Sequence, residues 1–391
     1  MSQRVIPSER ILMGPGPSNV DPRVLRALAA PVMGHLDPDF LAIMEDTMGL
    51  LRMVFGTKNQ LTMPMSGTGS AGMETVLVNF VEPGDRVVVA VCGLFGERMV
   101  DILERVGAEV SRVEAPWGRA VDPEDIRRVA KERAPVKAIC VVHAETSTGV
   151  RQDLEPVAAV AREVDALLIV DCVTSLGGMP VNVDEVGVDV AYSGSQKCLS
   201  CPPGLAPVTA NDRALELLDR RRGKVPSWYL DLTMIRRYWG QERFYHHTAP
   251  VNMIYALREA VYLIVQEGLQ NVYQRHARNM AALVAGLEAL GVGDFLPPEG
   301  QRLASLAVIK VPEGVDELAV RRFLLREFSL EIAGGLGPLK GKVWRIGLMG
   351  YNSKPRNVIL LLSALAAALR QQGVKVDLEA SLAAALKVLS S

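Results

Sequence analysis

Two hydrophobic patterns alternate along the first half of the chain. Short continuous apolar runs, such as Ala-Ile-Cys-Val-Val and Ala-Leu-Leu-Ile-Val, are typical of parallel strands that are buried on both faces. The segments between them repeat their apolar positions every three to four residues, as amphipathic helices do. Strands are predicted at residues 86–91, 137–143, 166–172, 189–193 and 205–210, and helices at 70–80, 97–106, 123–133 and 156–164. This order of elements predicts a doubly wound α/β domain with a mostly parallel sheet.

The pattern changes on both sides of this region. Upstream, residues 38–55 place their apolar side chains on one helical face, and Pro38 suits the first turn of such a helix. Downstream, residues 252–290 form a long helical pattern that Gly268 interrupts. Further strands are predicted at 303–311, 330–333 and 343–348, and further helices at 316–328 and 356–371. We therefore predict an N-terminal arm over residues 1–20, a large domain over 21–265 and a smaller α+β domain over 266–391.

Composition and charge narrow the class of protein. Of the 391 residues, 49% are hydrophobic and 22% are charged, as in a globular protein with a substantial core. Lysine and arginine number 43 against 44 acidic residues, so the net charge of −1 gives no reason to expect nucleic acid or an anionic membrane as a partner. The five cysteines do not form the pattern of a secreted disulfide framework, and no stretch has the character of a signal peptide or a membrane span. We expect a cytoplasmic protein.

Two charged residues follow strands of the predicted sheet. Open α/β sheets bind their ligands beyond the carboxyl ends of the strands, and Lys197 comes just after the strand at 189–193. A lysine in that place can form a Schiff base with a carbonyl cofactor. Asp171 ends the apolar strand at 166–172, where a buried acid needs a positive partner such as a protonated pyridinium nitrogen. Taken singly, Lys197 could be a surface lysine, and Asp171 could be a helix cap or a member of a salt bridge.

A third element is the loop Met65-Ser66-Gly67-Thr68-Gly69-Ser70, which leads directly into a predicted helix. Its glycines would let the main chain approach an anion, and the free amides at a helix start donate to phosphate oxygens. A tight turn between strand and helix explains the glycines equally well. Two further loops could complete a pocket: Phe95 could stack on a ring, and the loop from His143 to Gly149 offers hydroxyl groups.

In combination, these strings resemble the class V aminotransferases of pyridoxal phosphate (PLP) fold type I, in particular the alanine–glyoxylate / serine–pyruvate aminotransferase family. The resemblance extends from Gly14-Pro15-Gly16-Pro17-Ser18-Asn19 to Trp344-Arg345-Ile346-Gly347-Leu348. Its most specific parts are Ser193-Gly194-Ser195-Gln196-Lys197, Tyr245-His246-His247-Thr248 and Glu145-Thr146-Ser147-Thr148-Gly149. It implies an α/β fold with a large doubly wound domain and a smaller α+β C-terminal domain.

The resemblance also implies roles for individual residues around the cofactor. Lys197 would carry PLP as a Schiff base and serve as the catalytic base. Phe95 stands where some members have tryptophan, and Ser70 where some have histidine. The cofactor ring would be bordered by Phe95, Thr146, Asp171 and Val173, and its phosphate by Ser66, Gly67, Thr68, Gly69, Ser70 and Gln196.

Substrate binding and assembly are implied in the same way. Tyr245 and Thr248 would reach the phosphate held by the neighbouring subunit, which implies a homodimer with shared active sites. Arg345 matches the arginine that binds the substrate carboxylate, for which a guanidinium offers two parallel hydrogen bonds. The turn around Gly16 would close over the same carboxylate. The implied reaction moves an amino group from L-alanine or L-serine to glyoxylate or pyruvate by a ping-pong mechanism.

Three other functions compete with this one. The first is the ureidoglycine–glyoxylate aminotransferase of purine catabolism, although His35 and Tyr245 stand where that branch prefers other polar residues. A cysteine desulfurase needs a reactive cysteine in the small domain, and no cysteine follows Cys201. A cofactor-binding protein without turnover would have no need to keep the lysine, the aspartate and the arginine together.

Overall fold

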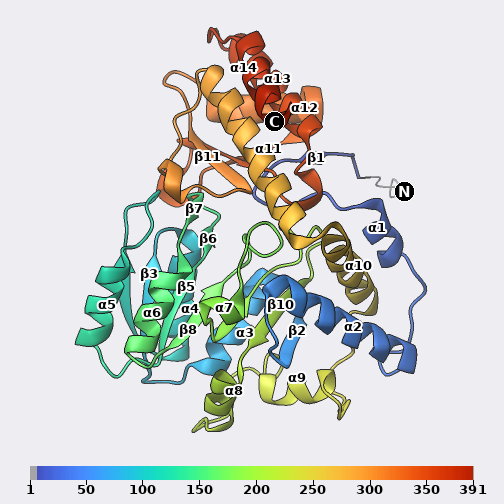
Figure 1. Ribbon diagram of the computed structural model, residues 1–391, viewed down its shortest axis with the longest axis vertical. Helices are drawn as coiled ribbons and strands as arrows, with labels where there is room; N and C mark the ends of the chain where they lie inside the picture. The colour runs from blue at the N-terminus through green and yellow to red at the C-terminus, as the bar shows by residue number, and fades with distance from the viewer. Residues whose placement is uncertain (1–6, 391) are drawn as a thin grey trace, which may run out of the picture.

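The computed structural model describes residues 7–390 and is built around a seven-stranded sheet (Figure 1). The strands lie in the order β2 (Leu61–Ser66), β10 (Leu205–Ala210), β9 (Val190–Tyr192), β8 (Leu167–Asp171), β5 (Ala138–Val142), β3 (Arg86–Val91) and β4 (Glu109–Glu114). From β9 to β4 all neighbours are parallel, whereas β10 is antiparallel to both of its neighbours. The prediction of a mostly parallel sheet is confirmed.

The central strands are buried on both faces, which explains their continuous apolar runs. Each residue of β5 and β8 is at most 2% exposed. Helix α3 packs against β9 and β10, α4 against β3 and β4, and α6 against β8. The helices of this part are α1 (Pro22–Leu28), α2 (Pro38–Phe55), α3 (Gly69–Phe80), α4 (Leu94–Val106), α5 (Pro123–Glu132), α6 (Leu154–Glu163), α7 (Val183–Val186), α8 (Asp212–Asp219), α9 (Leu232–Trp239) and α10 (Val251–Glu267). A short hairpin, β6 (Ala144–Glu145) with β7 (Val150–Arg151), follows β5.

The sequence pattern does not predict the two edge strands of the sheet. Strand β4 has the sequence Glu-Val-Ser-Arg-Val-Glu, and only Val113 is buried, because one side of the strand has no neighbour. Strand β2 contains Pro64, which has no N–H to donate and is tolerated at a sheet edge. Edge strands therefore lack the apolar signal that identified the central ones.

A second hydrophobic core lies in the C-terminal part of the chain, at the top of Figure 1. It is formed by a three-stranded antiparallel sheet, in the order β11, β14, β13, and by the helices packed on it. Its elements are α11 (Leu269–Ala289), β11 (Leu306–Lys310), α12 (Glu317–Phe328), β12 (Leu330–Glu331), β13 (Ala333–Gly334), β14 (Val343–Gly347), α13 (Pro355–Gln371) and α14 (Leu378–Ser390), with 3-10 turns at Glu299–Gln301, Gly337–Leu339 and Gly350–Asn352. Helix α14 is not predicted by the sequence pattern. Gly268 separates α10 from α11, as expected.

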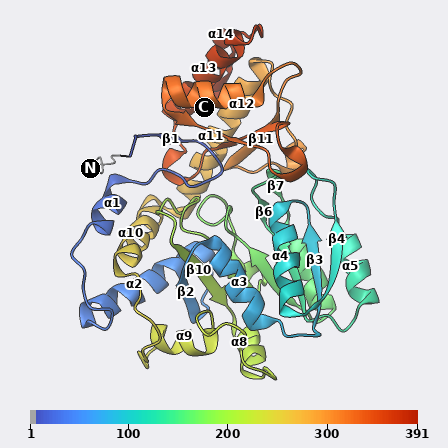
Figure 2. The same ribbon diagram turned by 180° about the vertical axis from the view of Figure 1, so that it is seen from behind.

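The N-terminal segment crosses to this second core. Strand β1 (Ile11–Leu12) pairs in parallel with β12, and Met13 is fully buried among the C-terminal side chains. In Figure 2 the blue N-terminal trace runs into the orange and red group at β1. Residues 11–13 are thus fixed to the C-terminal part of the chain, and the turn at Gly14–Asn19 lies between the two cores.

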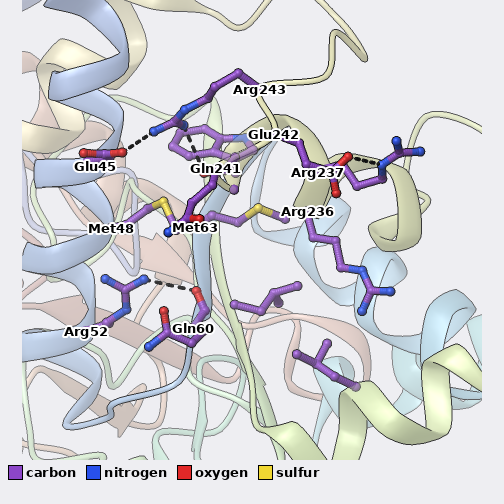
Figure 3. Close-up of a pocket in the computed structure, with 14 residues that line it drawn as sticks. Glu45, Met48, Arg52, Gln60, Met63, Arg236, Arg237, Gln241, Glu242 and Arg243 are labelled. Carbon is purple, nitrogen blue, oxygen red and sulfur yellow. Dashed lines mark hydrogen bonds and ion pairs between the residues drawn. The ribbon is translucent and has the colours of Figure 1, made fainter.

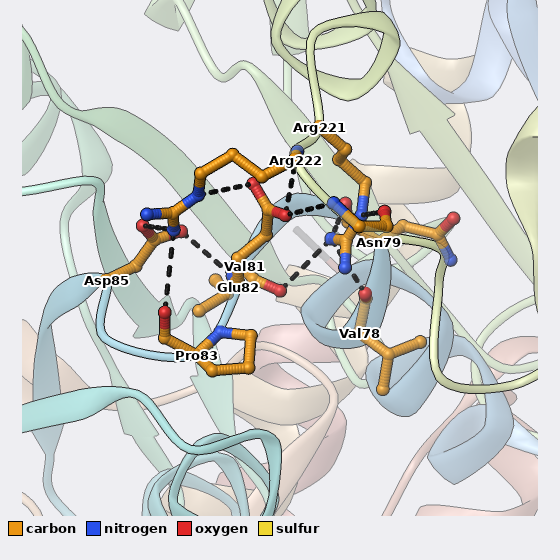
Figure 4. Close-up of polar contacts among 9 residues, drawn as sticks. Val78, Asn79, Val81, Glu82, Pro83, Asp85, Arg221 and Arg222 are labelled. Carbon is orange, nitrogen blue, oxygen red and sulfur yellow. Dashed lines mark hydrogen bonds and ion pairs between the residues drawn. The ribbon is translucent and has the colours of Figure 1, made fainter.

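An arginine fixes the segment that follows α8 to the end of α3 (Figure 4). The Arg221 guanidinium donates to the carbonyl oxygens of Val78, Asn79 and Val81 at 3.1, 2.7 and 3.1 Å. These carbonyls lie at the helix C-terminus, where a cation also interacts favourably with the helix dipole. The side chain of Asn79 extends the attachment by bonding the main chain at Leu230 and Leu232. Both ends of the segment 221–232 are therefore attached to the C-terminal end of α3.

Two alanine substitutions inside helices should have opposite effects on stability. A Cβ at Gly72 in α3 would lie 2.9 Å from Cβ of Ala206 and 3.4 Å from the Ser193 carbonyl, so α3 would have to move off the sheet. We expect Gly72→Ala to lower the free energy of unfolding by about 1–3 kcal/mol. Gly49 in α2 has no heavy atom within 4 Å of such a Cβ, and Gly49→Ala should raise stability by about 0.5–1 kcal/mol. Chemical unfolding of the two variants tests this, and equal effects would contradict it.

Candidate active site

Asp171 is a buried carboxylate at the carboxyl end of β8. Its Oδ2 accepts a hydrogen bond from the Tyr192 hydroxyl at 2.7 Å, and its Oδ1 accepts one from the Val173 amide at 2.8 Å. The parallel register places Asp171 opposite Tyr192, which brings the two side chains together. Burial raises the pKa of Asp171 to about 6, because a charge without water around it is unfavourable. A positive ring nitrogen beside Asp171 would stabilise its ionised form.

Lys197 lies in the loop after β9 and is only 8% exposed. Its ammonium donates to the Pro15 carbonyl oxygen, so the N-terminal turn lies directly against it. Gly16 has a φ of 107°, and a Cβ there would lie 3.0 Å from the lysine Nζ, so only glycine suits this turn. Burial and the nearby Arg345 charge lower the pKa of Lys197 to about 8. The lysine is thus partly neutral near physiological pH.

Arg345 extends from β14 of the second core toward the same place. Its Nε donates to the Gly334 carbonyl at 2.8 Å and its Nη1 to the Thr146 carbonyl at 3.3 Å. Among the described residues no carboxylate forms a salt bridge with it, although the side chain is nearly buried. Burial lowers the pKa of Arg345 to about 10. A guanidinium has five N–H donors, so three stay free for a ligand carboxylate.

The predicted phosphate loop lies at the start of α3. Strand β2 ends at Ser66, and Thr68 takes the N-cap position without bonding its own side chain to the helix. Within residues 7–390 no group accepts from the main-chain amides of Gly69 and Ser70, so both can donate to an anion. A Cβ at Gly194 would lie 3.3 Å from the Gly69 Cα. The lysine loop and the start of α3 are therefore in close contact, as a shared cofactor requires.

Gln196 and Val173 complete this part of the site. The Gln196 Oε1 is buried without a partner, and it lies 3.0 Å from the Cβ position of Gly194. If the Gln196 side-chain amide is flipped, its NH₂ group points to this place and can donate to a phosphate oxygen. Val173 packs against Gly69, at 3.3 Å from its Cβ position. Thr146 bonds to the hydroxyl of Thr174, a buried neighbour of the Asp171 strand end.

Phe95 is held in place by Glu145, a residue that is fully buried. Glu145 Oε2 accepts from the amides of Phe95 and Gly96 at 3.1 and 3.4 Å, and the Ser147 hydroxyl accepts from Leu94 at 2.9 Å. The hairpin β6–β7 thereby caps α4, whose own N-cap is glycine. A Cβ at that N-cap, Gly93, would meet both Glu145 and Ser147 within 2.6 Å. Sequence reasoning did not reveal this contact, because the partners are about fifty residues apart.

Arg98 is a second residue that the sequence pattern did not identify. It lies one turn after Phe95, with its guanidinium 4.9 Å from the centre of that ring, and it donates to the Ser70 hydroxyl at 3.0 Å. A positive charge next to the free amides of α3 fits a phosphate site. The signal available in the sequence was its spacing of three from Phe95 on the same helix.

Tyr245 and Thr248 do not contact the other predicted site residues of the same chain. Tyr245 is 54% exposed, and its ring lies 5.2 Å from that of His35. Thr248 is exposed as well. Only their neighbour His247 reaches the site, with its Nε2 at 3.1 Å from the Ser66 hydroxyl.

A cavity of about 800 Å³ lies apart from these residues (Figure 3). Its wall is formed by α2, β2, α8, α9 and the segment after α9. Arg243 points to Glu45 across it, Arg237 to Glu242, and Arg52 donates to the Gln60 carbonyl at 3.1 Å. It contains none of the predicted site residues, whereas a second cavity of about 720 Å³ is lined by Arg345.

Comparison with known proteins identifies the family. The model of the family "Aminotransferase class-V" matches residues 12–354. The chain belongs to the class V aminotransferases. The alanine–glyoxylate aminotransferase of Drosophila melanogaster is 42% identical to this aminotransferase over 379 residues, which cover 95% of this chain and 96% of the relative. The resemblance found in the sequence is confirmed.

Solved structures agree with this family. The ureidoglycine–glyoxylate aminotransferase of Bacillus subtilis superposes with a TM-score of 0.97 at 42% identity, over 100% of both chains. The alanine–glyoxylate aminotransferase of a Nostoc species superposes with a TM-score of 0.93 at 50% identity, over 95% of this chain and 98% of that one. The predicted PLP fold type I is confirmed, and the aminotransferase acts on small amino and oxo acids.

Pyridoxal phosphate is the cofactor of this aminotransferase, and the residues present fit it. A buried lysine with a lowered pKa, a buried carboxylate, two free helix amides and a cation beside them match its aldehyde, ring nitrogen and phosphate. Residues 7–390 contain no cluster of side chains suited to a metal ion. No helix in that range has the length and apolar character needed to cross a membrane.

The titration of Lys197 should be visible in the cofactor-free protein. Only a neutral amine attacks an aldehyde, so we expect the rate of reaction with added PLP to rise with pH through a midpoint of about 8. Arg345→Gln removes a positive charge that lowers the pKa of Lys197, and should move the midpoint to higher pH. Rates followed by absorbance across the pH range measure both. A midpoint at the ordinary lysine value in the unsubstituted protein would contradict the burial argument.

Proposed function

We propose that the enzyme moves an amino group from L-alanine or L-serine to glyoxylate or pyruvate. The observation that carries this proposal is the free Arg345 guanidinium, which lies near the buried Lys197 and has no carboxylate of its own. A substrate held by its carboxylate at Arg345 has its Cα toward the lysine. The Pro15–Gly16 turn lies against the lysine so closely that a Cβ at Gly16 would clash with it, and such crowding favours a small donor. The 50% identity to an alanine–glyoxylate aminotransferase supports the same choice.

Lys197 and Asp171 then have separate tasks in the reaction. When bound, PLP supplies an electron sink for the pair left at the substrate Cα. Lys197 would hold the cofactor. Once released, its amine would accept the α-proton from the substrate and return it to the cofactor carbon next to the transferred nitrogen. Its lowered pKa suits an acceptor of this kind. Asp171, fixed by Tyr192 and Val173, keeps the ring nitrogen protonated.

We propose that the two substrates use the one site in turn. The donor leaves as an oxo acid before the acceptor binds, which is a ping-pong order. Both are small α-carboxylates, so Arg345 can bind each of them in the same way. Ser66 to Ser70, Gln196 and Arg98 would hold the phosphate throughout, with Phe95, Val173 and Thr146 beside the ring.

The alternative is a ureidoglycine–glyoxylate aminotransferase. The 42% identity and the TM-score of 0.97 to that enzyme of B. subtilis support it. Against it stand His35 and Tyr245, which by the resemblance drawn from the sequence occupy positions where that branch prefers other polar residues.

We further propose a homodimer in the cytoplasm. Large aromatic side chains are exposed along residues 228–245, with Trp228 at 62%, Tyr229 at 42%, Phe244 at 56% and Tyr245 at 54%. Exposed apolar groups in one segment are typical of an interface, and this segment includes Tyr245, one of the two residues predicted to reach the neighbouring site. The five cysteines are buried and unpaired, which suits a reducing compartment.

The donor can be identified without coupling enzymes. We expect L-alanine or L-serine, added without any acceptor, to bleach the visible band of the holoenzyme, and glyoxylate or pyruvate to restore it. Lys197→Ala should slow the bleaching by about 10²–10⁴-fold or more. Bleaching only by (S)-ureidoglycine would favour the alternative. A variant that turns over at the normal rate would refute the role of the lysine.

Shared sites predict complementation between two inactive variants. Lys197→Ala removes the amine of one site, and Tyr245→Ala with Thr248→Ala removes what a subunit gives to the neighbouring site. In a mixed dimer one site would carry both defects and the other none, so co-expression should restore activity that neither variant has alone. Each variant expressed with itself is the control. A mixture that stays inactive although mixed dimers form would contradict the shared site.

A further inference from the structure

Two histidines of the Tyr-His-His-Thr segment have no part in the reaction described above, yet they form a hydrogen-bonded chain to the phosphate loop. The His246 Nε2 lies 3.2 Å from the Trp228 carbonyl oxygen, and its Nδ1 lies 2.8 Å from the Nδ1 of His247. The His247 Nε2 in turn lies 3.1 Å from the Ser66 hydroxyl. The chain therefore runs from a main-chain carbonyl to Ser66, three residues before the first free amide of α3.

The carbonyl at one end determines where the protons lie. A carbonyl oxygen only accepts, so the His246 Nε2 carries a hydrogen. In a neutral imidazole the other nitrogen is then bare, and the contact between the two Nδ1 atoms requires the hydrogen to be on His247. The His247 Nε2 is consequently bare and accepts from the Ser66 hydroxyl. In this state Ser66 uses its only hydrogen on His247 and presents lone pairs elsewhere.

One added proton reverses the chain without breaking any hydrogen bond. With both nitrogens of His246 protonated, the His246 Nδ1 donates to His247, the hydrogen of His247 lies on its Nε2, and that nitrogen donates to Ser66. The Ser66 hydrogen is then free to donate to an anion at the start of α3. The two states differ by one proton taken from solvent, and by one positive charge near the loop.

We propose that His246, His247 and Ser66 are a proton-linked part of the phosphate site, in which binding of a phosphate dianion is accompanied by uptake of one proton by the imidazole pair. Ser66 changes from a donor to His247 into a donor to the phosphate. The role is one of positioning, because the histidines act through Ser66. It depends on residues 66–70 being the phosphate site, as proposed above.

The surroundings of His247 favour its neutral form in the empty site. Burial, then His246, then His35 lower the pKa of His247 to about 4. The ring centres of Tyr229 and Tyr238 lie 5.2 and 5.6 Å from that of His247, and the Trp228 ring stacks on His246 with the centres 4.4 Å apart. The Arg243 charge interacts electrostatically with Tyr238. A bound dianion favours the charged state of the chain. Over the pH range in which the empty site is neutral and the filled site is charged, phosphate affinity should fall about tenfold for each pH unit of increase.

Calorimetric titration of the cofactor-free full-length protein with pyridoxamine 5′-phosphate tests the linkage. This ligand has an amine instead of the aldehyde, so it does not react with Lys197. Titrations at ~pH 7 in buffers of different ionisation enthalpy give the number of protons taken up on binding. We expect the unsubstituted protein to take up about one proton more than His247→Gln. The glutamine amide can donate to Ser66 permanently, so this variant should keep its affinity within a few-fold.

Three more variants separate this role from a structural one. Ser66→Ala should weaken binding by about 10- to 100-fold and abolish the extra proton, because the donor to the phosphate is lost. Ser66→Thr keeps the hydroxyl and should restore both. His35→Gln removes one neighbour that lowers the pKa of His247 but leaves the hydrogen-bonded chain intact, so the extra proton should still be taken up, over a pH range moved to higher values.

Two results would overturn different conclusions. Equal proton uptake by the unsubstituted protein and His247→Gln, with tight binding in both, would refute the proton linkage and leave the phosphate site intact. Equal affinities for pyridoxamine with and without its phosphate would refute the phosphate site itself, and with it the cofactor placement on which the proposed function depends.

Discussion

The structure depends on keeping one lysine buried and satisfied at the meeting point of three chain segments. The amine of Lys197 donates to the Pro15 carbonyl, and the Ser18 hydroxyl donates to the main-chain oxygens of Gln196 and Lys197. On the other side of the loop, the Ser200 hydroxyl accepts from the Tyr351 amide at 2.8 Å. A charged amine without water or partners would be costly to bury. The N-terminal turn and the C-terminal core therefore hold the lysine loop as one unit, and a shift of either would change its environment.

The charges around this lysine are arranged so that the ones needed for a ligand are left unpaired. Glu145 is close enough to influence Arg345 and Lys197, but its two oxygens already accept from helix α4 and Ser147. Arg345 is left with carbonyl partners only, which satisfy part of its hydrogen-bonding capacity without neutralising its charge. An acid occupied by amides and an arginine held by carbonyls together produce a site ready for an external carboxylate.

Helix α3 connects the phosphate loop to the segment predicted to reach a second subunit. Arg221, at the start of the segment 221–248, binds the C-terminus of α3. His247, near the end of the same segment, bonds to Ser66, which precedes the N-terminus of α3. The sequence separation between these contacts is large, but in space the segment begins and ends on one helix. The proposed assembly and the proposed phosphate site thus both depend on helix α3, and the histidine pair lies between them.

The sequence determined the buried centre of the sheet and the charged residues after its strands. Continuous apolar runs identify strands covered on both faces, and Asp171 and Lys197 could be placed because the carboxyl ends of parallel strands share one edge. Edge strands β2 and β4, the cap that Glu145 provides to α4, and the chain from Trp228 to Ser66 could not be obtained in this way. Each depends on groups far apart in sequence, whose meeting is decided by packing. Local hydrophobic periodicity records which face of an element is buried, but only the tertiary structure decides which polar groups share that buried space.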